Sequence, residues 1–111
     1  MGEDYLGEFE HLVMLAIVRL DGDAYGVTIG HELEQQGGRR ASFGAVYSTL
    51  RRLEAKGYIA SRTSAPEPVA GGRARKLFTV TPAGLEVTRR SQRLLERMAE
   101  GVDLGGSEAR P

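Results

Sequence analysis

The chain has 111 residues and no net charge, so it has room for one small domain, which buries a smaller share of its surface than a larger domain does. It contains no cysteine, which excludes disulfides and thiolate metal sites, and it has no apolar run as long as a membrane span. These features predict a small cytoplasmic protein with no cofactor and no membrane attachment, for which burial against a partner subunit would be unsurprising.

The zero net charge conceals a separation of charges along the chain. Residues 1–38 hold eight acidic residues and one basic residue, whereas residues 39–76 hold nine basic residues and two acidic ones. The rest of the chain is balanced. A basic middle third is the pattern expected of a surface that binds nucleic acid, and the acidic remainder discourages indiscriminate binding.

Two helices are predicted in the first third of the chain. Apolar residues recur at helical spacing from Phe9 to Leu20, and this first helix ends at the turn Asp21-Gly22-Asp23. A second, shorter helix is predicted to begin near Tyr25 or Gly26 and to stop at Gly37-Gly38.

The stretch from Ser42 to Ile59 reads as one helix of about four turns, with Ser42 as its N-cap and Lys56-Gly57 as its end signals. One side is apolar, through Val46, Leu50 and Leu53. The opposite side carries small and basic residues, namely Gly44, Ser48, Arg51 and Ala55, flanked by Tyr47 and Arg52. We therefore expect the apolar side to pack and the other side to be free to lie in a DNA groove.

Two short β-favouring runs follow, at residues 60–63 and 77–80. The segment between them contains two prolines and two glycines, which suit a hairpin with a long tip, and carries Arg73, Arg75 and Lys76 on its far side. Three helices followed by a basic hairpin predict a winged helix-turn-helix, a mainly α fold with a small β-hairpin (α+β).

A last helix is predicted to open at Thr81-Pro82, which supply an N-cap and a proline at the first helical position. Its apolar residues form an intermittent stripe that has little of its own domain left to cover, at Val87, Leu94, Leu95, Met98 and Val102. The predicted organisation is a DNA-binding domain at residues 1–80, a dimerisation helix at 81–103 and a disordered tail at 104–111.

Over roughly residues 8 to 102 the chain resembles the PadR-like transcriptional regulators. The resemblance rests on residues 24–29 (AYGVTI), residues 44–59 (GAVYSTLRRLEAKGYI), and residues 71–76 (GGRARK) leading through Phe78 to residues 81–84 (TPAG). The family commonly has proline after the tyrosine of the third helix, where this chain has Ser48. The resemblance implies a homodimer, joined through the last helix and the first, that binds a palindromic operator and is usually a repressor released by a small molecule.

Each candidate site has an ordinary alternative. The candidate DNA contacts are Ser42, Gly44, Tyr47, Ser48, Arg51, Arg52, Arg73, Arg75 and Lys76. They could instead be ordinary solvated surface residues. Tyr47 is almost as well explained as an aromatic residue at the edge of the core. The candidate dimer interface could instead pack within its own domain, and consists of Leu12, Leu15, Val87, Leu94, Leu95 and Met98. His11 and His31 lack partner ligands at metal-binding spacing, so no metal site is predicted.

The predicted function is that of a dimeric DNA-binding repressor. An apolar or aromatic effector is expected between the first and last helices, with Leu15, Val18, Leu94 and Met98 as candidate lining. The alternative is a winged-helix module that binds proteins rather than DNA, although such a module has no need of the basic excess in residues 39–76. No catalytic motif is present in the sequence, so an enzyme is not predicted.

Overall fold

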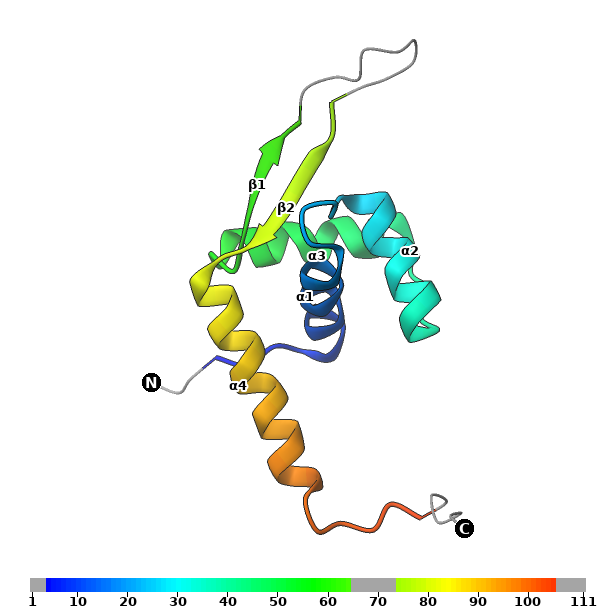
Figure 1. Cartoon of the computed structure of the whole chain (residues 1–111), viewed down its shortest axis with the longest axis vertical. Coiled ribbons are helices and arrows are strands. Elements are labelled where there is room, and N and C mark those ends of the chain that lie inside the picture. The colour runs from blue at the N-terminus through cyan, green and yellow to red at the C-terminus, as the bar shows by residue number, and fades with distance from the viewer. Residues whose placement is uncertain (1–3, 65–73, 106–111) are drawn as a thin grey trace.

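The structure, a computed structural model, describes residues 4–64 and 74–105. Within these residues the chain forms a mainly helical fold with one antiparallel hairpin, as the sequence predicts (Figure 1). The elements in chain order are α1 (Glu8–Leu20), α2 (Gly26–Gly37), α3 (Phe43–Ala55), β1 (Ile59–Thr63), β2 (Lys76–Val80) and α4 (Pro82–Ala99).

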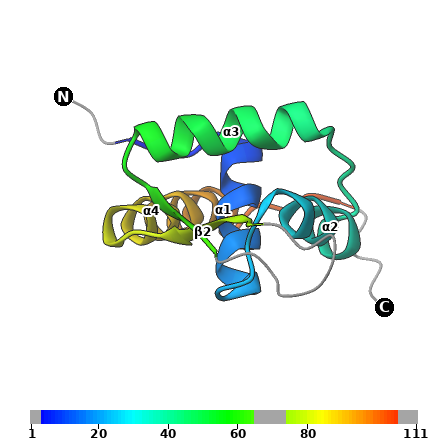
Figure 2. The same ribbon diagram turned by 90° about the horizontal axis from the view of Figure 1, so that it is seen from above.

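The core forms where α1 meets the other elements. Figure 2 shows α3 along one edge of the molecule, with α1, α2 and α4 on a single side of it. The predicted apolar side of α3 faces inward, and its residues Val46, Leu50 and Leu53 are buried. They pack in one cluster with apolar side chains from every other element, including Met14, Ile17, Ile29, Leu33, Ile59, Phe78 and Val87.

The ends of α3 follow from its terminal residues. The Ser42 hydroxyl accepts a hydrogen bond from the Ala45 N–H at 3.1 Å, which confirms the predicted N-cap. At the other end Gly57 adopts φ +82°, a left-handed conformation that turns the chain out of the helix. The helix therefore ends at Lys56-Gly57, as predicted, and Ile59, the last residue of the stretch expected to be helical, is instead the first residue of β1.

The hairpin pairs Ile59 with Val80 and Thr63 with Lys76 at its two ends. Its base is attached to the helical body, because the Phe78 N–H donates to the Ala24 carbonyl at 2.8 Å. The hairpin therefore projects from a fixed base beside α3 (Figure 1). The predicted tip at residues 65–73, which includes Arg73, lies outside the described residues.

The last helix begins as predicted, with the Thr81 hydroxyl accepting from the Gly84 N–H at 3.0 Å and Pro82 in the first turn. Its first half is part of the core, where Gly84, Val87 and Ser91 are buried. Its second half extends away from the other helices (Figure 1). Residues 106–111 of the predicted tail lie outside the described residues. None of the described helices is long and apolar enough to cross a membrane.

Candidate nucleic-acid interface

The outward side of α3 is the first part of the candidate interface. Ser42, Gly44 and Arg51 are exposed there, and Ser48 is half-buried. The side is open because α1, α2 and α4 all lie on the opposite side of α3 (Figure 2). A helix presented in this way fits the major groove of a duplex, which is about 12 Å wide.

Tyr47 lies between the packed and the open sides of α3. Its hydroxyl rests against Gly26 at the start of α2, where any added Cβ would collide with it. The ring nevertheless stays 40% exposed. Tyr47 is therefore an aromatic residue at the edge of the core, and its contact with DNA stays a prediction.

The adjacent residues Arg51 and Arg52 have different surroundings. Arg52 donates to the hydroxyls of Thr49 at 3.2 Å and Ser48 at 3.4 Å, and its Nε lies 3.6 Å from Glu10 Oε2 on α1. Arg51 is exposed and makes no hydrogen bond or ion pair within residues 4–64 and 74–105. Of these two candidate DNA contacts, only the Arg51 side chain is left without a partner in the part of the chain that the structure describes.

Glu10 is the acidic centre to which the end of α3 is attached. One of its carboxylate oxygens accepts from the Gly7 N–H at 3.1 Å, and the other lies 3.1 Å from Lys56 Nζ. Burial by itself would raise the pKa of Glu10, but the Gly7 hydrogen bond, together with Lys56 and Arg52, lowers it below the ordinary value of 4.5. The charged carboxylate is therefore stabilised by folding, and it fixes the C-terminal end of α3 on α1.

A lowered pKa in the folded state means that this stabilisation is present above pH 4.5 and is lost as the pH falls through the folded value. We expect Glu10→Gln to reduce the free energy of unfolding by about 1–2 kcal/mol at pH 7. The difference from wild type should shrink between pH 5 and pH 3, measured as urea midpoints at matched protein concentration. Glu96→Gln, at an exposed site on α4, is the control and should change little.

The hairpin carries the second group of predicted DNA contacts. The Arg75 guanidinium lies over the Tyr25 ring, 4.8 Å from its centroid, and the Arg75 N–H donates to the Ser64 hydroxyl at 2.9 Å. Lys76 Nζ lies 3.6 Å from a Glu54 carboxylate oxygen at the end of α3. Both side chains are thus held beside the helical body, where exposed cations could meet phosphates flanking the groove.

Much of the charge separation seen in the sequence is cancelled by folding. Arg39 pairs with Glu8 at 3.3 Å, and Arg40 pairs with Glu34 at 3.6 Å, in addition to the Glu10 and Glu54 pairs. Sequence reasoning missed Arg62, which is exposed on β1 and, like Arg51, makes no ion pair within the part of the chain that the structure describes. The alternation of faces along a strand was the available signal, because it puts Arg62 on the opposite face from the apolar Ile59.

The predicted dimer residues do not all lie on one surface. Leu15, Leu95 and Met98 are exposed, and Leu12 and Leu94 are half-buried. Val87 is 1% exposed and packs in the core of its own chain, so its assignment to a dimer interface is wrong. Helical spacing placed Val87 in the stripe, but the first half of α4 packs on the core and the apolar residues of its second half are left uncovered.

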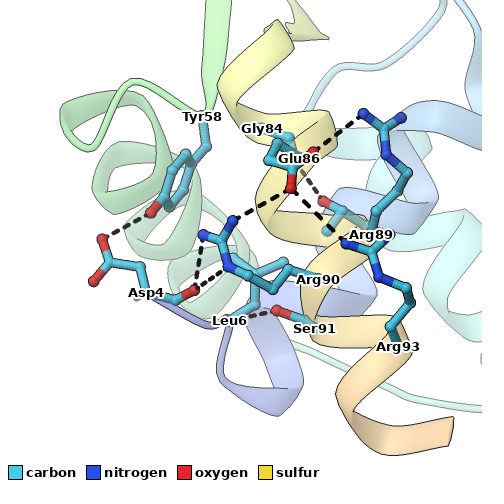
Figure 3. A network of polar contacts seen from close by, with 10 residues as sticks. Asp4, Leu6, Tyr58, Gly84, Glu86, Arg89, Arg90, Ser91 and Arg93 are labelled. Atoms are coloured by element: carbon cyan, nitrogen blue, oxygen red, sulfur yellow. Dashed lines mark hydrogen bonds and ion pairs between the residues drawn. The ribbon is translucent and has the colours of Figure 1, made fainter. Parts of the chain in front are cut away.

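A groove of about 330 Å³ lies between α1 and α4 and is closed at one end by the segment before α1. Figure 3 shows this segment tied to α4: the Leu6 N–H donates to the Ser91 hydroxyl at 2.9 Å, and Arg90 donates to the Asp4 carbonyl at 3.0 Å. Tyr58 donates its hydroxyl proton to the Asp4 carboxylate at 3.0 Å. The groove is lined mainly by apolar side chains, among them Tyr5, Leu6, Leu12, Leu15, Leu94 and Leu95.

Comparison with known proteins agrees with this arrangement. Residues 14–90 match the model of the transcriptional regulator PadR-like family, and these residues include most of α1, all of α2, α3 and the hairpin, and the buried start of α4. The chain belongs to the PadR-like family. PadR-like proteins are DNA-binding transcriptional regulators and not enzymes, so the predicted class of function is confirmed.

Individual PadR-like relatives support the same assignment. The chain is 40% identical over 86 residues to the transcriptional regulator Rv3488 of Mycobacterium tuberculosis, covering 78% of this chain and 75% of that protein. The solved PadR family regulator of Eggerthella lenta is 28% identical, with a TM-score of 0.66 over 85% of this chain and 81% of that one. A PadR family regulator of Clostridium difficile is 26% identical, with a TM-score of 0.63 over 84% and 95%.

The departure of this PadR-like chain from the usual proline after the α3 tyrosine has a structural counterpart. Ser48 supplies a hydroxyl acceptor to Arg52, which a proline could not do. Ser48 thereby helps hold Arg52 on the side of α3 that faces Glu10.

Proposed function

We propose that this PadR-like regulator is a homodimeric repressor that acts in the cytoplasm on a palindromic operator and is released by a small molecule. The observation that carries the dimer is the uncovered second half of α4, where Leu95 is 58% and Met98 is 70% exposed. Apolar side chains at this exposure are typical of a surface that a partner covers. A second copy supplies the matching surface, because a two-fold interface uses the same residues from both chains.

The division of the chain follows from this dimer. Residues 1–80 form the DNA-binding part, in which α3 enters the major groove and the hairpin lies against the backbone. Residues 81–103 contain the dimerisation helix, although the start of α4 also completes the core. If the two-fold axis lies near the end of α4, we expect the two copies of α3 to meet the same face of the duplex, with half-site centres about 10 base pairs apart or a multiple of that spacing.

The dimer proposal predicts that Leu95→Glu combined with Met98→Glu yields a monomer. Two unpaired carboxylates buried in the interface cost several kcal/mol, whereas they are harmless on an exposed helix. Sedimentation should change from about twice the chain mass of 12.0 kDa to that mass. Leu85→Glu is the matched control, because Leu85 is also exposed on α4 but lies in its first turn, and it should leave the dimer intact. A double variant that sediments like wild type would show that this surface is not the interface.

The groove between α1 and α4 is the proposed effector site. Its apolar lining includes Leu15 and Leu94, and it also contains His11, whose Nε2 is buried without a hydrogen-bond partner among the described residues. These features fit an apolar or aromatic molecule that alters how α4 lies on α1. Val18, an expected lining residue, instead lines a separate groove with Asp21, Phe78 and Leu85, and Met98 lines neither groove.

An effector acts on this dimer only through its different affinities for the DNA-bound and free forms.

The protein-interaction alternative is disfavoured by the exposed cations Arg51 and Arg62, which have no partner within the described residues and serve no packing role. Selection of duplexes from a random pool by the full chain tests the proposal. We expect enrichment of a palindrome, and a pool that stays unenriched would contradict sequence-specific binding.

A further inference from the structure

Phe43 is a large apolar side chain that the fold leaves mostly exposed. It is the first residue of α3, and 61% of it is exposed. Its neighbours Ser42 and Gly44 are small and exposed, so they leave most of the ring open. The ring lies in one exposed apolar cluster with Tyr47 and Val27, and such a cluster, unlike a single exposed apolar side chain, indicates a surface that a partner contacts.

The ring is also held in place before any partner arrives. Its centroid lies 6.1 Å from that of Tyr47, with the two planes tilted by 35°. Tyr47 in turn rests on Gly26, so Phe43 leans on an aromatic residue that α2 supports. Val27, 51% exposed, lines the same shallow groove of about 210 Å³ as Phe43. The N-terminal end of α3 thus presents a small preformed apolar surface, which binds at a lower entropic cost than a mobile side chain.

We propose that Phe43 contacts the methyl group of a thymine in the major groove and so sets the base preferred at one position of each half-site. This inference rests on the proposed function, because it requires α3 to lie in the groove. The first residues of a recognition helix are those that reach base edges. On these edges the thymine methyl is the apolar group that distinguishes one base pair from another, whereas a charged phosphate gains little from an apolar ring.

The test isolates the methyl group. A palindromic duplex is first enriched from a random pool by the wild-type chain, and each thymine is then replaced by uracil, which pairs identically but lacks the methyl. For wild type we expect one position per half-site at which uracil weakens binding about fourfold, and about fifteenfold when both half-sites are changed, from the transfer free energy of one buried carbon group.

Phe43→Ala should bind the thymine and uracil duplexes equally, while Leu85→Ala, which removes an exposed apolar side chain from α4, should keep the wild-type preference. The assignment of Phe43 is overturned if uracil has no effect on wild-type binding at any position, or if Phe43→Ala still prefers thymine to uracil. In either case DNA binding itself still stands. If wild type enriches no duplex at all, the proposed function fails and this inference fails with it.

Discussion

Replacing Gly84 with alanine is expected to lower the free energy of unfolding by about 3 kcal/mol, near the upper end for overpacked sites. Gly84 lies in the first turn of α4, directly against the backbone of Tyr58. An added Cβ would overlap the Tyr58 carbonyl oxygen and would lie 3.0 Å from Met14 Cε. The backbone cannot give way easily, because the same carbonyl accepts from the Thr81 N–H at 3.1 Å.

The matched control is Gly30→Ala. Gly30 is also in a helix, but an added Cβ there meets nothing within 4 Å, so alanine should stabilise α2 by about 0.5–1 kcal/mol. Thermal unfolding at one protein concentration measures both effects, with a decrease of about 15 °C for Gly84→Ala and a small increase for Gly30→Ala. A Gly84→Ala chain that melts with wild type would show that the close approach relaxes at no cost.

The Gly84 contact matters to function because it joins α4 to the chain that leaves α3. Tyr58 lies between the end of α3 and the start of β1, and the Thr81 hydroxyl donates to the Gly57 carbonyl at 2.7 Å in the same place. The proposed dimerisation helix and the proposed reading helix are thereby attached through two neighbouring backbone contacts. We propose that these contacts transmit a change in the direction of α4 to α3, which is the coupling that the proposed effector site between α1 and α4 requires.

Local signals in the sequence were sufficient for the helices and the hairpin. Ser42 and Thr81 cap the helices that they were expected to cap, and Val46, Leu50 and Leu53 face the core. These features depend on neighbouring residues and on a period of 3.6, both of which can be read directly from a sequence. The family resemblance added the class of function, which the family match confirms.

Contacts between distant residues could not be predicted in the same way. Helical spacing placed Arg52 on the flank of α3, but it could not predict that Arg52 lies beside Glu10. Glu10 reaches the end of α3 only because α1 packs there, and its other partner, Lys56, is 46 positions away in the sequence. Val87 has the spacing of the exposed stripe and is nevertheless buried, because the start of α4 docks on the core. Periodicity identifies a face of a helix, and only the tertiary arrangement decides what covers that face.

Arg51 and Arg52 were both expected to contact DNA, but their different surroundings indicate different roles. We propose that Arg51 reads a base edge, while Arg52 positions the end of α3 through Glu10 and Ser48. An arginine held bidentate to guanine contributes about 1–3 kcal/mol of discrimination, so loss of Arg51 from both subunits is expected to weaken binding to the operator about thirtyfold or more. Arg75, on the hairpin, is expected to contact phosphate, which carries no sequence directly.

The central claim, that α3 reads the sequence while the hairpin holds the backbone, is tested most directly by one titration. The affinities of the enriched palindrome and of a scrambled duplex are measured across a salt series for wild type, Arg51→Ala, Arg51→Lys and Arg75→Ala. Arg51→Lys keeps the charge but loses the bidentate fork, so it separates base reading from attraction to phosphate.

We predict that both Arg51 variants lose affinity for the palindrome far more than for the scrambled duplex. Arg75→Ala should weaken both duplexes alike and reduce the log–log salt slope by about two for a dimer. Equal losses on the two duplexes for Arg51→Ala, or a loss confined to the palindrome for Arg75→Ala, would contradict the claim.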